Sequence, residues 1–463
     1  MQSLFEHAPD SAPALFDVAS GEAYDYGRLR DAVGALARTL RSAGGGLVFH
    51  HCRTDAASVV AYLACLEAGT PVALLDPNLS AEMRGRPLEL YRPELVIAPP
   101  EAAPPEPGYR RVGEAGPGLG LWRRSDDDAP RSVDAELAVL LSTSGSTGSP
   151  KFVRLGGRAI RSNAEGIREA LAITADDRPI SSLPFYYSYG LSVLNSHLLA
   201  GAELVLTGEG LTSGVFWGAF RERRCTSFAG VPYSYQMLQR LDIDKLDIPT
   251  LNTMTQAGGK LHDRFVQAFH DKITRRERGR LFVMYGQTEA TARISILPAE
   301  RLPEKIGSAG LPLAGGRLEI VDGEVVYHGP NVMLGYAETP ADLAAGDQQR
   351  GRLETGDLGY LDDEGFLYIT GRLKRIAKVF GLRISLDEVE DLVRPYGPAA
   401  AVGADEKLLI WCEFGDDAEF QRLSGLLADK LKVHPTALRF RRIAALPLNA
   451  NGKVDYQELA QQA

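Results

Sequence analysis

The sequence has little of what marks a membrane, secreted or nucleic-acid-binding protein. Its 463 residues include only four cysteines, too scattered for a zinc site or a disulfide framework, so we expect reduced thiols. No stretch approaches the roughly 18 consecutive apolar residues of a membrane span. A formal net charge of −9 without long Lys/Arg runs argues against nucleic-acid binding. Because Met1–His7 show no basic, apolar leader pattern, we expect a cytoplasmic protein.

The common nucleotide-binding loop, Gly-x-x-x-x-Gly-Lys-[Ser/Thr], is absent as well. Residues 140–151 read instead Leu-Leu-Ser-Thr-Ser-Gly-Ser-Thr-Gly-Ser-Pro-Lys, directly after an apolar run that predicts a buried strand over 137–141. Such a loop presents successive backbone N–H groups and hydroxyls, which suits a polyphosphate. Taken alone, the segment is equally well explained as an ordinary Gly/Ser turn.

The chain is long enough for two or three domains. Its first 210 or so residues alternate helical and strand patterns, which predicts a largely parallel sheet. The Pro/Gly-rich stretch from Pro99 to Gly120 has no periodicity, and we expect an exposed connection there. Near Gly316 the pattern changes, and Asp322-Gly323 between two alternating runs predicts a β-hairpin.

We therefore predict an α/β protein with two domains. Residues 1–372 would form a large N-terminal domain of α/β layered subdomains with a small β-rich subdomain, and residues 373–463 a small α/β C-terminal domain.

Three further segments carry residues suited to nucleotide chemistry. Tyr285-Gly286-Gln287-Thr288-Glu289 follows a predicted strand, and ligands bind at strand ends in open α/β sheets. Its hydroxyl and carboxylate could bind Mg²⁺ on a triphosphate. Asp357 and Arg372 could bind ribose hydroxyls. Lys453 follows Asn451-Gly452 and would lie at the tip of a turn. Each segment alone is also compatible with a plain turn or a solvated side chain.

In order and content these segments resemble the acyl-adenylate-forming superfamily along nearly the whole chain. This superfamily includes acyl-CoA synthetases, adenylation domains of peptide synthetases and beetle luciferases. The resemblance also rests on the segments 183–190 (Leu-Pro-Phe-Tyr-Tyr-Ser-Tyr-Gly), 230–232 (Gly-Val-Pro), 257–259 (Ala-Gly-Gly), 329–336 (Gly-Pro-Asn-Val-Met-Leu-Gly-Tyr) and 371–381 (Gly-Arg-Leu-Lys-Arg-Ile-Ala-Lys-Val-Phe-Gly).

The resemblance implies an enzyme that joins a carboxylate to the α-phosphate of ATP and releases pyrophosphate. Thr288 and Glu289 would serve the α-phosphate and Mg²⁺, and Lys453 would bridge the carboxylate and the α-phosphate. The remaining implied ATP-binding residues are Thr143, Ser144, Gly145, Ser146, Thr147, Gly148, Lys151, Gly258, Tyr285 and Gly286, with Asp357 and Arg372 on the ribose.

The resemblance further implies a second step in which a thiol takes the acyl group. The thiol would belong to CoA or to the phosphopantetheine of a separate acyl carrier protein. The C-terminal domain would be mobile and would rotate about Lys374 between the steps, with Lys378 serving the second reaction. Val379, Phe380 and Gly381 would line the path of the thiol.

The predicted pocket for the carboxylic acid consists of Phe185, Tyr187, Tyr189, Gly230, Val231, Gly259 and Met284. Amino-acid-activating relatives have an aspartate directly after the phenylalanine, whereas this chain has Tyr186. Because a buried ammonium group needs a partner, an α-amino acid is disfavoured. The aromatic, hydroxyl-bearing pocket favours an aryl acid or a short to medium acyl group. We therefore predict an acyl- or aryl-CoA ligase. The alternatives are an enzyme that loads an amino or hydroxy acid onto a separate carrier protein, a non-catalytic nucleotide or acyl-adenylate sensor, and a luciferase-like oxygenase.

Overall fold

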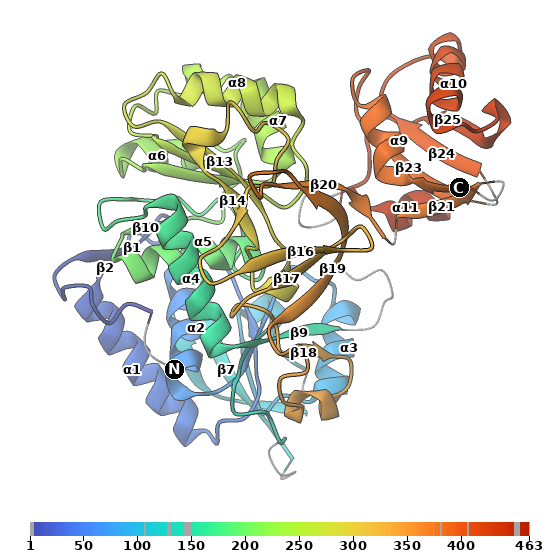
Figure 1. Cartoon of the computed structure of the whole chain (residues 1–463). Helices are drawn as coiled ribbons and strands as arrows, with labels where there is room; N and C mark the ends of the chain where they lie inside the picture. Colours follow the sequence, from blue (N-terminus) through green and yellow to red (C-terminus); the bar gives the residue numbers. More distant parts are fainter. Residues whose placement is uncertain are drawn as a thin grey trace. The chain divides into compact units, whose positions relative to one another are not determined.

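The chain divides into two compact units (Figure 1). The first consists of Met1–Arg317 and His328–Leu353, and the second of Leu318–Tyr327 and Glu354–Ala463. The computed structural model describes residues 4–105, 108–126, 131–142, 151–373, 375–379, 382–404, 407–448 and 454–462, apart from the side chains of Lys378 and Arg383. The predicted domain boundary after residue 372 stays a prediction.

The first unit contains an eight-stranded sheet with the order β18-β9-β8-β4-β3-β5-β7-β6. Its centre is parallel, as the alternating sequence pattern predicts, because β3 pairs in parallel with β4 and β5, and β4 with β8. The strands are β3 (Val48–His51), β4 (Val72–Leu75), β5 (Leu95–Ala98), β6 (Tyr109–Gly116), β7 (Leu119–Arg124), β8 (Leu137–Ser142), β9 (Phe152–Gly156) and β18 (Gly335–Ala337).

A second, five-stranded sheet has the order β11-β12-β13-β14-β15. Strands β11, β12 and β13 are parallel, and β14 and β15 are added antiparallel. The strands are β11 (Ser227–Gly230), β12 (Thr253–Gln256), β13 (Arg280–Tyr285), β14 (Ser295–Leu297) and β15 (Leu311–Pro312). A three-stranded sheet combines β10 (Leu204–Leu206), β1 (Pro13–Asp17) and β2 (Ala23–Asp25).

Several helices of the first unit begin at a residue whose side chain caps the helix. The side chain of Asp55 accepts a hydrogen bond from the backbone N–H of Ser58 at the start of α2, and Gly69 ends that helix in the left-handed conformation. The helices are α1 (Tyr26–Ser42), α2 (Ala56–Ala68), α3 (Ala81–Tyr91), α4 (Gly157–Leu171), α5 (Ser188–Ala200), α6 (Gly214–Glu222), α7 (Pro232–Leu241) and α8 (Asp263–Ile273).

The second unit has its own core of buried apolar side chains, among them Val389, Ile410 and Leu427. A four-stranded sheet, β16-β17-β19-β20, lies almost entirely in this unit. The predicted hairpin is confirmed, because β16 and β17 are neighbours joined by Asp322 and Gly323, both at positive φ. The elements are β16 (Arg317–Val321), β17 (Glu324–His328), β19 (Arg352–Leu361), β20 (Leu367–Arg372), β21 (Ile376–Val379), β22 (Leu382–Ser385), α9 (Leu386–Val393), β23 (Ala399–Ala404), β24 (Lys407–Cys412), α10 (Asp417–Leu431), β25 (Leu438–Arg442) and α11 (Tyr456–Gln461).

The expectation of a connection without regular structure from Pro99 to Gly120 is wrong for its second half. Much of the segment is exposed, as expected, but its second half forms β6 and the start of β7, which extend the large sheet at its edge. Two irregularities in the β6–β7 pairing interrupt the alternation of side chains, so the strand period is hidden in the sequence. Burial of Leu121 and Trp122 stabilises the pair.

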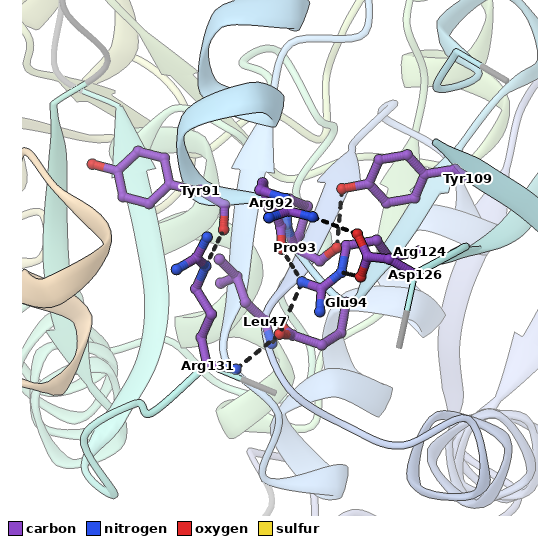
Figure 2. A network of polar contacts seen from close by, with 9 residues as sticks. All are labelled: Leu47, Tyr91, Arg92, Pro93, Glu94, Tyr109, Arg124, Asp126 and Arg131. Carbon is purple, nitrogen blue, oxygen red and sulfur yellow. Dashed lines mark hydrogen bonds and ion pairs between the residues drawn. The ribbon is translucent and has the colours of Figure 1, made fainter. Parts of the chain in front are cut away.

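A buried glutamate joins the loops at one edge of this sheet (Figure 2). Glu94 accepts hydrogen bonds from the backbone N–H groups of Leu47 (2.6 Å) and Arg131 (3.0 Å). Its carboxylate also lies 3.5 Å from the guanidinium of Arg124, which binds Asp126 at 2.6 Å. A buried carboxylate is tolerated only when it is paired and hydrogen-bonded in this way, so the network fixes the ends of β3 and β7.

The close approach of Gly46 to Glu94 gives a test of this network. Gly46 has a φ of +84°, and a Cβ there would lie 2.6 Å from the Glu94 carboxylate. We expect Gly46→Ala to lower the free energy of unfolding by about 2–4 kcal/mol, because backbone strain adds to the displacement of a buried, hydrogen-bonded charge. Urea denaturation would measure the loss. Gly21→Ala is the matched control, since Gly21 has a φ of +73° but open space around it. Equal losses in the two variants would contradict this account.

Candidate active site

The carboxyl ends of three parallel strands form the frame of the candidate site. Strands β11, β12 and β13 end at Gly230, Gln256 and Tyr285, and because the strands are parallel these ends lie at one edge of the sheet. Tyr187 lies just before α5 and Gly258 just after β12, and both contribute to this edge. Residues from separate sequence segments are thus brought together inside the first unit.

Two glycines at this edge leave no room for a side chain. A Cβ at Gly286 would lie 2.0 Å from the backbone oxygen of Ala292. Gly258 has a φ of +84°, and its Cβ would lie 2.6 Å from the hydroxyl of Tyr187. The loop after β13 can therefore fold back on itself, and the loop after β12 can approach the Tyr187 ring closely.

The predicted pair Thr288 and Glu289 lies in a short 3₁₀ turn, Thr288–Ala290, directly after β13. The Thr288 hydroxyl lies 3.2 Å from that of Ser188 at the start of α5. The Tyr336 hydroxyl donates to the Glu289 carboxylate at 2.9 Å. Burial and the Glu289 charge raise the pKa of Tyr336, so its phenol stays protonated and can donate. Both predicted side chains are held in defined positions by neighbours from other segments.

Lys151, the last residue of the predicted phosphate loop, extends this arrangement. Its Nζ atom lies 3.6 Å from the centre of the Tyr336 ring and 2.9 Å from a Glu338 carboxylate oxygen. The same tyrosine therefore contacts Lys151 with its ring and Glu289 with its hydroxyl. The other predicted loop residues, Thr143, Ser144, Gly145, Ser146, Thr147 and Gly148, lie outside the described residues.

The predicted acid pocket lies beside this edge. Phe185, Tyr189, Val231 and Met284 are buried, whereas Tyr187 is half-buried, with its ring 6.3 Å from that of Tyr189 and nearly perpendicular to it. The Tyr189 hydroxyl lies 2.8 Å from that of Thr255 on β12. The backbone oxygen of Gly259 accepts a hydrogen bond from Gln256, which fixes the loop after β12.

A cavity of about 30 Å³ lies between α4, α5 and strands β11–β13, and Tyr189 and Met284 are part of its wall. Arg293 also lines this cavity, and the sequence patterns did not predict it. The available signal is a charged residue within the otherwise uncharged run from Ala290 to Ile296, just after the Thr288-Glu289 pair. Its guanidinium lies over the Tyr189 ring, 4.0 Å from the ring centre.

The predicted ribose-binding residues lie in the second unit and are brought together there. Asp357 on β19 faces Arg372 on β20 in the strand register, and Nε of Arg372 donates to the Asp357 carboxylate at 2.9 Å. Lys378 lies in β21, and the Val379 side chain is part of the core of the unit. Lys374, Phe380, Gly381 and Lys453 fall outside the described residues.

A metal ion at this site would depend on ligands beyond the side chains. The described part of the chain contains no group of three or more His, Cys, Asp or Glu side chains placed to bind a metal ion. Magnesium binding at Glu289 and Thr288 would therefore need oxygen ligands from phosphates or water, the ligands that Mg²⁺ usually retains.

Among the helices of the same described ranges, none has the length and apolar character needed to cross a membrane.

Comparison with known proteins identifies the family. Residues 4–337 match the AMP-binding enzyme family. A 2-succinylbenzoate–CoA ligase of Bacillus cereus is 29% identical over 346 residues, which cover 70% of each chain. A feruloyl-CoA synthase of Amycolatopsis sp. is 28% identical over 395 residues, covering 81% of this chain and 79% of the relative. The structure of o-succinylbenzoate CoA synthetase from Bacillus subtilis with its acyl-adenylate intermediate aligns with a TM-score of 0.78 at 24% identity, covering 99% of this chain and 97% of that one.

The chain therefore belongs to the AMP-binding enzyme family. It is an AMP-forming acid–thiol ligase, which uses ATP to activate a carboxylic acid before a thiol takes the acyl group. The α/β fold class inferred from the sequence is confirmed.

Tyr336 links Lys151 and Glu289, and its hydroxyl can be removed without changing the ring. We expect Tyr336→Phe to lower kcat/KM for ATP–pyrophosphate exchange by about 10- to 100-fold, since a hydrogen bond to a charged group is lost. The Mg²⁺ concentration needed for half-maximal exchange should rise. Tyr360→Phe is the control, because Tyr360 is 51% exposed and stacks on Tyr368. Unchanged exchange in Tyr336→Phe would remove Tyr336 from the site.

Proposed function

We propose that this chain is an aryl- or acyl-CoA ligase that forms an acyl-adenylate and then transfers the acyl group to CoA. The observation that carries the proposal is the contact series Lys151–Tyr336–Glu289 beside a buried, aromatic pocket at the ends of β11–β13. A cation, a carboxylate and an acid pocket in one unit are what the joining of a carboxylate to a nucleotide phosphate requires.

In the first step the acid attacks the α-phosphate of ATP. Two anions meet, and charge moves onto the bridging and leaving oxygens, so fixed cations and N–H donors stabilise the transition state. In this proposal Lys151 and residues 143–148 bind the β- and γ-phosphates, and Lys453 bridges the carboxylate and the α-phosphate. The Asp357 carboxylate accepts hydrogen bonds from the ribose, with Arg372 beside it.

Glu289 and Thr288 supply the kind of oxygen ligands that suit Mg²⁺. When bound, the ion would neutralise phosphate charge. Thr288 would orient the α-phosphate, and its position is supported by the Ser188 hydroxyl 3.2 Å away.

The second step would follow a rotation of the C-terminal domain, residues 373–463, about Lys374. This motion would withdraw Lys453 and bring Lys378 and the segment Val379-Phe380-Gly381 to the thiol path. One cavity would then serve two reactions in turn. Glycine at 381 would leave room for the pantetheine arm.

Aromatic acids are the substrate class that we favour. The two relatives named above act on 2-succinylbenzoate and form feruloyl-CoA, and both acids are aromatic. The pocket walls of this chain are aromatic as well, with Phe185, Tyr187 and Tyr189 together. An amino acid is a weaker candidate, because the cavity contains the cationic side chains of Arg280 and Arg293, which would repel an ammonium group.

The test is ATP–pyrophosphate exchange with Mg²⁺ over a panel of fatty, hydroxy, aryl and amino acids, followed by thioester formation with CoA. We expect exchange with aryl acids and a CoA thioester as product. Exchange without a CoA thioester would favour a separate carrier protein as the acceptor. Nucleotide binding without exchange by any acid would favour the sensor.

Lys453→Ala separates the two steps. We expect this variant to lose adenylate formation while thioester formation from synthetic acyl-AMP and CoA stays largely intact, because the lysine would act only in the first conformation. The two half-reactions would be assayed separately. An equal loss of both would refute the two-conformation proposal.

Gly381→Leu tests the thiol path. We expect pyrophosphate release to continue and thioester formation to fall by at least about 100-fold, since the side chain would block the pantetheine arm. Product analysis with CoA present gives the ratio of the two steps. A normal thioester yield would remove Gly381 from the path.

A further inference from the structure

Three arginines in the described part of the chain are buried, and they are stabilised very differently. Arg124 pairs with the carboxylates of Glu94 and Asp126. Arg154 donates to four backbone carbonyl oxygens and to the side-chain oxygen of Gln348. Arg124 thus has anionic partners, and each of the three Arg154 guanidinium nitrogens has at least one acceptor, although these acceptors are neutral.

Arg293 has fewer and weaker hydrogen-bond acceptors. Its guanidinium reaches the carbonyl oxygen of Ala292 at 3.2 Å, the Ser192 hydroxyl at 3.4 Å and the sulfur of Met284 at 3.4 Å. Arg293 is only 3% exposed, yet within the described ranges no carboxylate forms an ion pair with it. Burial lowers the pKa of Arg293, but an arginine stays charged in proteins.

The groups around Arg293 do not neutralise it. Burial raises the pKa of Tyr189 to about 12, so this ring offers its π-face and no negative charge near neutral pH. Burial lowers the pKa of His197, which is therefore neutral, and Nδ1 of His197 lies 2.8 Å from the Val193 carbonyl. Asp177 is a carboxylate of the cavity wall, but it binds the backbone N–H and hydroxyl of Thr174.

The balance of charge on the cavity wall is positive. Arg280 and Arg293 face one acidic side chain, Asp177, and the remaining polar groups on the wall are neutral hydroxyls and the His197 ring. A cavity of about 30 Å³ is large enough for a water molecule or a small polar group. An isolated buried charge is costly, so a site of this kind gains free energy when an anion enters.

We propose that Arg293 determines substrate specificity by binding a second anionic group of the acid, at the end remote from the reacting carboxylate. The substrate class is thereby narrowed to dicarboxylic acids, aromatic or aliphatic, whose second carboxylate reaches the cavity between α5 and β13. This inference rests on the proposed function. It uses the position of Arg293 beside Tyr189 and Met284, which belong both to the acid pocket and to the cavity wall.

A planar guanidinium suits this task, because it can bind a carboxylate through two parallel hydrogen bonds. A site built for a charged group also rejects the analogue that lacks the charge, since its own buried group is then left unpaired. The discrimination between a diacid and its half-amide is therefore the direct measure of the proposal.

The experiment compares diacids with their half-amides in ATP–pyrophosphate exchange. The acids are the aliphatic series from malonate to pimelate and phenyl-bearing diacids. We expect the wild type to prefer at least one diacid over its half-amide by about 100-fold in kcat/KM. Arg293→Met should abolish this preference by raising the KM for the diacid. Arg293→Lys should keep part of the preference, because an ammonium group retains the positive charge but cannot form the two parallel hydrogen bonds of a guanidinium.

Binding and stability give readouts that do not depend on turnover. Calorimetric titration of the preferred diacid should show binding to the wild type and none to Arg293→Met. The unliganded Arg293→Met protein should melt at the same or a higher temperature than the wild type, since an unpaired buried charge is removed. The control Arg124→Met should melt lower, because it leaves the carboxylate of Glu94 without its cationic partner.

The outcomes separate the two proposals. Exchange with monocarboxylic acids and no preference for any diacid would overturn this inference and leave the proposed function in place. An equal loss of activity toward a diacid and its half-amide in Arg293→Met would also overturn it, because a structural role alone would produce that result. Exchange with no acid at all would overturn the proposed function, and the inference with it.

Discussion

The amide of Asn331 fixes the loop on which the candidate site depends. This side chain is 2% exposed and donates to the backbone oxygens of Ala290 (2.9 Å) and Arg293 (2.8 Å). Between these oxygens Thr291 adopts a φ of +64° and donates its hydroxyl to the Asn331 backbone carbonyl at 2.7 Å. A left-handed threonine is strained, so the reciprocal hydrogen bonds supply the compensation that keeps this backbone in place. Glu289 precedes the tightly held segment and Arg293 ends it.

This constraint holds two side chains of opposite charge at the two ends of one short loop. At one end of the loop, Glu289 accepts a hydrogen bond from the Tyr336 hydroxyl, and the ring of the same tyrosine contacts Lys151. On the other side Arg293 enters the cavity beside Tyr189. A carboxylate suited to a cation and a guanidinium suited to an anion are thus separated by a rigid backbone. Such rigidity is what electrostatic preorganisation requires, because the charges do not have to reorient as the reaction proceeds.

Local pattern was enough to propose the site residues that lie in one continuous segment, and their roles stay predictions. Thr288 and Glu289 follow a strand, and Asp357 and Arg372 each lie within short motifs. Arg293 could not be identified in this way. Which acceptors reach an arginine depends on what the topology brings near. Arg154 and Arg293 are both flanked by uncharged residues in the sequence, and only the structure shows that Arg154 has five acceptors and Arg293 three. Strands β6 and β7 were not predicted for a related reason, since their irregular pairing removes the two-residue period on which strand prediction relies.

The contacts of Arg375 in the second unit suggest how a proposed rotation about Lys374 would be transmitted to α11, the helix that follows Lys453 in the sequence. Arg375, the next residue, binds Glu390 on α9 at 2.7 Å, and its guanidinium lies 3.8 Å from the centre of the Tyr456 ring. The Tyr456 hydroxyl in turn donates to Glu390 at 3.1 Å. The residue after the proposed hinge and the helix after Lys453 are therefore bound to the same buried carboxylate. Because breaking a buried, hydrogen-bonded ion pair is costly, motion at the proposed hinge would be transmitted to α11 rather than absorbed between Arg375 and that helix.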